Sequence, residues 1–108
     1  MEMAPDRYRF ILEQPIREAA GRTWNYSGGA VALLGKLIEY GSGMTLDAYA
    51  ARKLFEPLGI GRFEWVAGDD GEPSAASGLR LTLPDLAKIG RLVVDRGVYD
   101  GRQIVPAE

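Results

Sequence analysis

The stretch GRTWNYSGGAVALLG, residues 21–35, is the most informative part of this chain. It places the hydroxyl of Tyr26 beside the glycine pair Gly28–Gly29, where an apolar segment begins. Apolar residues then recur at helical spacing for three turns, and Gly41–Gly43 supplies a stop signal. Ser27 is suited to the N-cap, because its side-chain oxygen can accept from backbone N–H groups one turn later. The stretch therefore predicts a helix that follows Ser27 and stops at the glycines.

Three further segments show the same periodicity. Apolar residues recur at i, i+3 and i+4 in residues 8–12, 46–54 and 83–94. Start and stop residues flank the last two of these segments, namely Thr45 with Pro57, and Thr82 with Gly97. The helices predicted from these patterns would pack together around one core, because a chain of 108 residues is too short for two domains.

Extended structure is expected only in short pieces. Phe63–Val66 alternates β-prone residues, Leu79–Leu81 could form a second extended piece, and Asp100-Gly101 favours a turn. We therefore expect a mostly α fold: a small helical domain of about four helices with at most a short irregular β element. Residues 1–108 are expected to form this single domain.

Three motifs together resemble a known family. They are the Tyr26-Ser27-Gly28 entrance to the apolar helix, LFEPLGI at residues 54–60 and SGLRLTLPDLA at residues 77–87. On these residues the chain resembles the serine beta-lactamase family, which includes class C beta-lactamases, D-alanyl-D-alanine peptidases and related esterases. The resemblance runs from about Pro5 to Glu108 and implies the central helical segment of that fold.

The resemblance implies roles for two residues of the entrance. Tyr26 matches the tyrosine that relays a proton between nucleophile, lysine and leaving group in that family. Gly28 stands where the family usually has an asparagine whose amide contacts the substrate, so esters become more plausible substrates than lactams or peptides. Each residue also has a purely structural interpretation. Tyr26 could simply pack at a helix start with its hydroxyl in water, and Gly28 could permit close backbone approach.

The catalytic centre of that family is absent from this sequence. No serine is followed three residues later by lysine, and no histidine is present. Lys88-Ile89-Gly90 imitates the family's Lys-Thr-Gly triplet, but it lies inside a helical pattern. We therefore expect a partial, truncated beta-lactamase-like hydrolase that is inactive alone. Its parent would hydrolyse a lactam, peptide or ester through an acyl-serine. The alternative is a non-catalytic helical binding module whose uncovered apolar surface favours self-association.

The composition excludes several classes of partner. With 13 basic and 15 acidic residues, a net charge of −2 gives no electrostatic basis for binding nucleic acid or an anionic membrane. The absence of cysteine and histidine excludes disulfides and the usual zinc sites. Asp69, Asp70 and Glu72 lack the alternating spacing of a calcium loop, so a solvated loop is expected. Neither a metal nor an organic cofactor is predicted.

Location can be predicted only for the residues given. No segment approaches the roughly 18 apolar residues of a membrane span, and MEMAPD at residues 1–6 lacks the features of a signal peptide. The chain is thus expected to be soluble and to carry no export signal. Relatives in the family that it resembles are commonly periplasmic or extracellular, so a complete parent could be exported.

Two contacts are also expected from residue type alone. Trp24 and Trp65 could line a substrate groove, but they are predicted to fill the core, because aromatic residues beside apolar helices usually do. Arg80 and Asp85 could pair and fix the turn between residues 77 and 86, although an exposed pair would stabilise it little.

Overall fold

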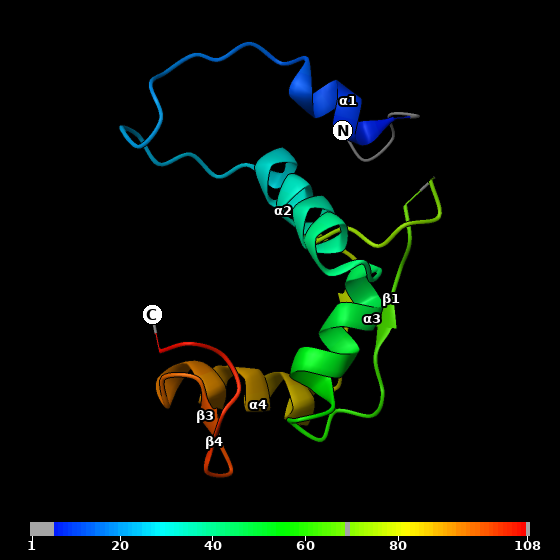
Figure 1. Cartoon of the computed structure of the whole chain (residues 1–108), viewed down its shortest axis with the longest axis vertical. Coiled ribbons are helices and arrows are strands. Elements are labelled where there is room, and N and C mark those ends of the chain that lie inside the picture. The colour runs from blue at the N-terminus through cyan, green and yellow to red at the C-terminus, as the bar shows by residue number, and fades with distance from the viewer. Residues whose placement is uncertain (1–5, 69, 108) are drawn as a thin grey trace.

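The computed structural model describes residues 6–68 and 70–107, and helices dominate them (Figure 1). The helices of these residues are α1 (Arg7–Leu12), α2 (Gly28–Ser42), α3 (Leu46–Ala50) and α4 (Leu83–Val94). Helix α3 continues into a π-helical turn, η1 (Ala51–Phe55). The short strands are β1 (Glu64–Trp65), β2 (Leu79–Arg80), β3 (Val98–Tyr99) and β4 (Arg102–Gln103). The predicted mostly α fold with about four helices is confirmed.

Local signals set the ends of α2. The Oγ of Ser27 accepts a hydrogen bond from the backbone N–H of Ala30 at 3.2 Å, which confirms the predicted N-cap. At the other end Gly43 adopts φ 71°, a left-handed conformation that glycine accepts without steric cost, and donates to the carbonyl of Glu39. The predicted helix and its stop are both observed.

The two threonines at helix starts behave differently. Thr82 Oγ1 accepts from the backbone N–H of Asp85 at 3.3 Å, as expected of a cap, and Pro84 lies in the first turn of α4. Thr45 occupies the N-cap position of α3, but its side chain makes no capping hydrogen bond. Helix α3 therefore depends on packing against its neighbours rather than on a side-chain cap.

The main core lies where η1 meets α4. Its buried side chains are those of Phe55, Leu58, Ile60 and Leu92. The rings of Phe55 and Phe63 pack with centroids 4.7 Å apart, so the chain leaving η1 folds back onto the cluster. The amide of Ile60 donates to the Phe55 carbonyl at 2.8 Å across Gly59, whose φ is 72°, and this left-handed stop ends the helical segment beside the core.

Two antiparallel strand pairs complete the described structure. Strands β1 and β2 pair with Glu64 opposite Arg80 and Trp65 opposite Leu79, which joins the two pieces expected to be extended. Strands β3 and β4 form a hairpin whose turn residues Asp100 and Gly101 have φ 51° and 77°. Positive φ at both central residues matches the twist of the strands, and the turn expected at this dipeptide is confirmed.

The chain has an unusually open shape. Helices α2, α3 and α4 follow one another in an arc, and residues 13–27 form an extended loop between α1 and α2 (Figure 1). The radius of gyration is 15.6 Å, against about 13 Å for a compact domain of this length. The accessible surface is 8165 Å², roughly 2,300 Å² above the ~5,900 Å² expected of a compact monomer of this mass.

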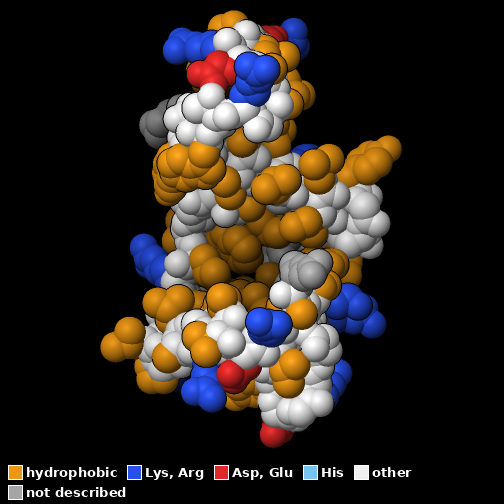
Figure 2. All heavy atoms as spheres, turned by 90° about the vertical axis from the view of Figure 1, so that its left-hand side faces the viewer, with side chains coloured by type: hydrophobic (Ala, Val, Ile, Leu, Met, Phe, Trp, Pro, Cys, Tyr) orange, Lys and Arg blue, Asp and Glu red, His pale blue; other side chains and the backbone are white. Residues whose placement is uncertain are grey.

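Much of the additional surface is apolar. Exposed side chains on α2 and α4 include Val31, Leu34, Leu37, Ile38, Leu83, Leu86, Val93 and Val94. Figure 2 shows hydrophobic side chains gathered around a hollow on the face toward which the arc of helices opens. None of the described helices is both long enough and apolar enough to cross a bilayer.

Candidate functional site

Tyr26 lies in the extended segment that leads into α2. Its side chain is 84% exposed, and its ring meets the edge of Trp24 with centroids 6.2 Å apart and planes at 63°. Within the described residues, its hydroxyl makes no hydrogen bond. The phenol oxygen is therefore accessible from the surface.

A pocket of about 330 Å³ lies beside Tyr26. Its lining comes from the extended segment, the first turns of α2 and a distant loop, namely Trp24, Asn25, Tyr26, Ser27, Gly28, Ala30, Val31, Ala75 and Ala76. The structure therefore brings together both residues singled out in the sequence, Tyr26 and Gly28. It also adds Ala75 and Ala76, which no sequence pattern connected to them.

The loop that carries Ala75 and Ala76 is firmly held. Ser74 is only 3% exposed, and its Oγ accepts from the backbone N–H of Ala76 at 3.1 Å. The indole N–H of Trp65 donates to the carbonyls of Ser74 at 2.9 Å and Ser77 at 3.1 Å. Because these contacts are made at both ends of the loop, this wall of the pocket is formed in advance of any ligand.

Helix α2 approaches that loop closely at Gly35. A Cβ placed there would lie 2.9 Å from the Cβ of Ala75 and 3.1 Å from Cδ2 of Leu46. Only glycine permits this approach without displacement of its neighbours. The sequence contained a signal for it, because a glycine inside an apolar helix costs about 1 kcal/mol relative to alanine and so indicates a packing reason.

The expected core position of Trp24 is wrong. Its side chain is 82% exposed, because residues 13–27 form neither helix nor strand and leave it on the surface beside Tyr26. Trp65 is half-buried at β1, outside the main core cluster, and supports the pocket loop through its indole N–H. The alternative that the sequence left open, a tryptophan beside a substrate groove, fits the position of Trp24 in the pocket lining.

Ionic contacts attach α1 and α2 to the loop that carries Asp70 and Glu72, which precedes the pocket residues Ala75 and Ala76 in the chain. Arg7, whose side chain is 2% exposed, lies 3.1 Å from the Asp70 carboxylate and donates to the Glu72 carbonyl at 3.1 Å. Lys36 of α2 contacts the Glu72 carboxylate at 3.2 Å and lies over the ring of Tyr8. The predicted solvated acidic loop is therefore an anchoring loop at Asp70 and Glu72, whereas Asp69 lies outside the described residues.

The contact with Glu72 shifts the pKa of Lys36. Partial burial alone would lower its pKa, but the hydrogen bond and charge of Glu72 outweigh that effect, and the charge of Glu39 adds to them. The pKa of Lys36 is therefore raised above its ordinary value. In the parts of the chain that the structure describes, no group of three or more acidic, histidine or cysteine residues could hold a metal ion.

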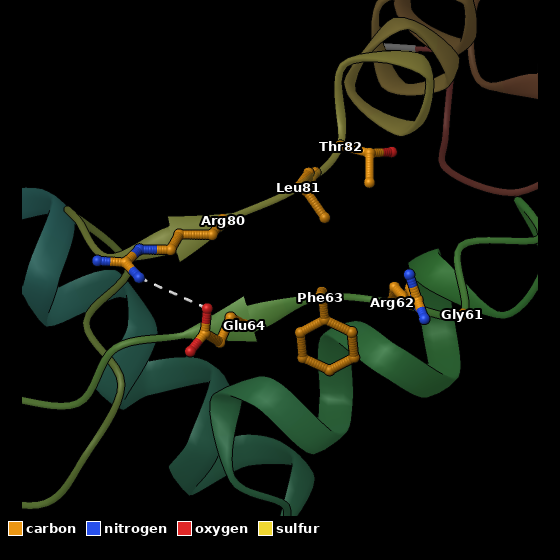
Figure 3. A pocket seen from close by; sticks show the side chains of 7 residues that line it. All are labelled: Gly61, Arg62, Phe63, Glu64, Arg80, Leu81 and Thr82. Carbon is orange, nitrogen blue, oxygen red and sulfur yellow. Dashed lines mark ion pairs between the residues drawn. The ribbon is translucent and has the colours of Figure 1, made fainter.

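A second cavity, of about 540 Å³, opens between β1 and β2 beyond their paired residues (Figure 3). Figure 3 shows the Arg80 guanidinium turned toward the Glu64 carboxylate, which it meets at 3.5 Å. The expected contact between Arg80 and Asp85 is wrong, because the strand register places Arg80 opposite Glu64. Asp85 instead pairs with Lys88 at 3.1 Å. Glu64, the acidic residue among those that line this groove, is therefore engaged by Arg80, and Arg62 adds a second cation to the lining.

Lys88 occupies an ordinary helical position, as predicted. It lies in α4, where it pairs with Asp85 and donates to the carbonyl of Gly59 at 3.4 Å. The Lys88-Ile89-Gly90 triplet therefore does not lie on a strand beside the pocket.

Two comparisons with known proteins found matches to this chain. A model of the beta-lactamase family matches residues 2–107. The fold is similar to that of the "Putative 6-aminohexanoate-dimer hydrolase from Bacillus anthracis", with a TM-score of 0.85 and 24% sequence identity. That match covers 94% of this chain and 26% of the other, so the chain spans about a quarter of the matched protein's length. No curated protein matches the chain.

Proposed function

Because the chain belongs to the beta-lactamase family, we propose that it forms the helical part of a serine hydrolase in which Tyr26 relays a proton during acyl transfer. The parent reaction is hydrolysis of an ester, lactam or peptide through an acyl-serine, with esters favoured. By itself the chain is inactive, because it contains no Ser-x-x-Lys. This route requires neither a metal nor an organic cofactor.

The uncovered apolar face is the observation that carries this proposal. Exposed aliphatic side chains follow α2 and α4, and the molecule opens a hollow on that side (Figure 2). A monomer rarely exposes such a surface unless another surface covers it. The matched structure contains almost four times the length of this chain, which is enough to supply the covering part and the nucleophile.

The proposed chemistry gives Tyr26 one defined task. The serine oxygen of the covering part bonds to the acyl carbon, and the proton that it loses passes by way of the Tyr26 hydroxyl to the leaving group. Water then attacks the acyl-serine, releases the acid and restores the serine. No lysine or arginine lines the pocket with Tyr26, so the cation that activates the phenol also comes from the covering part.

A chimera tests the proposal directly. This chain replaces the matching segment of the Bacillus anthracis protein, and hydrolysis of 4-nitrophenyl butanoate is followed by release of 4-nitrophenolate. Positioned acid–base groups contribute about 10²–10⁴-fold to a rate, so Tyr26→Phe should lower kcat by about 10²-fold or more. Far-ultraviolet circular dichroism establishes that both chimeras are folded.

Tyr40→Phe is the matched control. Tyr40 lies near the opposite end of α2 and is 91% exposed, so loss of its hydroxyl should leave kcat within about twofold. Unchanged kcat in the Tyr26→Phe chimera, or equal losses in the two variants, would contradict a proton relay at Tyr26.

A second function is favoured by the same exposed surface. The surplus area of roughly 2,300 Å² on one chain exceeds the ~800 Å² that each partner of a standard interface buries, so a non-catalytic module could associate with its own copies. Sedimentation velocity over a dilution series should then show dimers that dissociate on dilution. A monomer at every concentration excludes this function.

The second function, unlike the first, requires that residues 1–108 fold as one domain without a covering part. A two-dimensional amide NMR spectrum should then show dispersed peaks of uniform width, because a packed core gives each amide its own environment. Broad, collapsed peaks would mean that the covering part is required for folding.

A further inference from the structure

We propose that the pocket beside Tyr26 binds the uncharged, apolar acyl group of the substrate, so that the parent enzyme acts on neutral acyl compounds. The inference deepens the proposed function and rests on it. It assigns a substrate class to the pocket that Trp24, Gly28, Val31 and Ala76 help to form.

The charge of the lining supports this class of ligand. None of the nine lining residues is acidic or basic, and the polar ones are Asn25, Tyr26 and Ser27. The Ser27 hydroxyl oxygen already accepts from the Ala30 amide. An ionised group that entered the pocket would lose water and gain no charged partner among these nine residues, whereas an alkyl or aryl group loses nothing comparable.

The dimensions of the pocket are also suitable. Its volume is about 330 Å³, whereas a cavity of about 150 Å³ lined by apolar side chains holds benzene. A short alkyl chain or a single aromatic ring therefore fits with space remaining. Since Gly28 has no side chain, the part of the pocket next to Tyr26 stays open to the bond that reacts.

The structure also gives the pocket one rigid wall. Gly35 lets α2 pack against Ala75, and Trp65 holds both ends of the loop through the carbonyls of Ser74 and Ser77. A wall that is already in place binds an apolar group without the cost of ordering it. The opposite wall carries Trp24 and the phenol of Tyr26, so a bound acyl group lies next to the proposed proton relay.

Binding can be measured on this chain without any catalysis. Because the sequence has no Ser-x-x-Lys, methyl butanoate should persist during a titration followed by amide NMR of the labelled chain. We expect it to shift the amides of Gly28, Val31, Ala75 and Ala76. Sodium butanoate, which has the same chain but a carboxylate, should produce shifts at least ten times smaller at equal concentration.

Two leucine substitutions make a matched pair. Ala76→Leu fills the pocket and should abolish the shifts with methyl butanoate, whereas Ala87→Leu changes an exposed residue of α4 outside the lining and should leave them unchanged. Val31→Ala removes part of the wall without adding bulk and should weaken binding several-fold. The amide spectrum of each variant shows whether it is folded.

Three results would overturn the inference. They are equal shifts with ester and carboxylate, ester shifts located outside the pocket, and movement of the pocket amides on dilution alone, which would mean that a second copy fills the site. Hydrolysis by the chimera that depends on Tyr26 but is accompanied by none of these pocket shifts would leave the proposed function intact and this inference wrong. If methyl butanoate binds in the pocket but Tyr26→Phe leaves the kcat of the chimera unchanged, this inference stands and the proposed function is wrong.

Discussion

Gly35→Ala tests the contact that fixes the pocket wall. A Cβ at this position would meet the Cβ of Ala75 at 2.9 Å, closer than side-chain carbons normally approach, and the Cβ of Ala75 can move only together with its backbone. Overpacking of this kind costs about 1–3 kcal/mol. Replacing a helical glycine by alanine also gains about 1 kcal/mol of helix propensity. The net change in the free energy of unfolding of this variant alone is therefore small or moderately negative.

Gly41→Ala supplies the reference that isolates the steric cost. Gly41 belongs to the same helix, and a Cβ there would meet no atom within 4 Å. It should therefore gain propensity alone, about 0.5–1 kcal/mol. Since the propensity gain largely cancels between the two variants, their free energies of unfolding should differ by about 1–3 kcal/mol, with Gly35→Ala the less stable.

Urea unfolding followed by tryptophan fluorescence measures this difference. A Trp24→Phe background leaves Trp65 as the reporter, and its indole N–H contacts the loop that Gly35 packs against. With a slope near 1.5 kcal/mol/M, the midpoints of the two variants should lie about 0.7–2 M apart. Equal midpoints would show that α2 does not press against Ala75, and would remove the argument for a preformed pocket wall.

Three further substitutions address the anchors of the helices. Arg7→Met should lower the free energy of unfolding by about 2–3 kcal/mol in thermal denaturation, because Asp70 and two backbone carbonyls lose their partner; a loss below about 0.5 kcal/mol would contradict this. Ser27→Ala should lower the free energy of unfolding by about 1 kcal/mol, because the N-cap bond is lost, and Ser27→Asp should leave it almost unchanged. Urea unfolding followed by far-ultraviolet circular dichroism measures both. The raised pKa of Lys36 means that its contact with Glu72 stabilises the chain below about pH 10.4 and stops doing so as pH rises through the folded-state pKa. The stability difference between the wild type and Lys36→Met should therefore shrink in strongly alkaline buffer, and a constant difference would refute the linkage.

Local signals explain why most elements could be predicted from the sequence. The caps at Ser27 and Thr82 and the left-handed turn at Asp100-Gly101 depend on residues within a few positions of one another. The periodicity that predicts helices also depends on residues only three or four positions apart. Thr45 shows the limit of such reasoning, because its residue type suits a cap but its side chain makes none.

The pocket required long-range contacts that periodicity does not contain. Ala75 and Ala76 reach the entrance of α2 only because Gly35 allows close approach and Trp65 bonds the intervening loop. Trp24 illustrates the opposite error. Its apolar type favours burial, but the described residues leave it 82% exposed.

The two walls of the pocket differ in how firmly this chain alone holds them. The wall at Ala75 is held by the indole of Trp65 and the backbone of α2. The wall at Tyr26 belongs to an extended segment that Ser27 joins to α2, and in the described structure the Tyr26 ring makes an aromatic edge contact with Trp24 of the same segment. Fixing the backbone of such a segment costs about 1–2 kcal/mol for each residue ordered. A covering surface that packs on Trp24 would offset that cost and orient the Tyr26 hydroxyl in the same step. Under the proposed function, formation of the catalytic geometry would thus be coupled to assembly, while the shape of the proposed acyl site is already present in this chain.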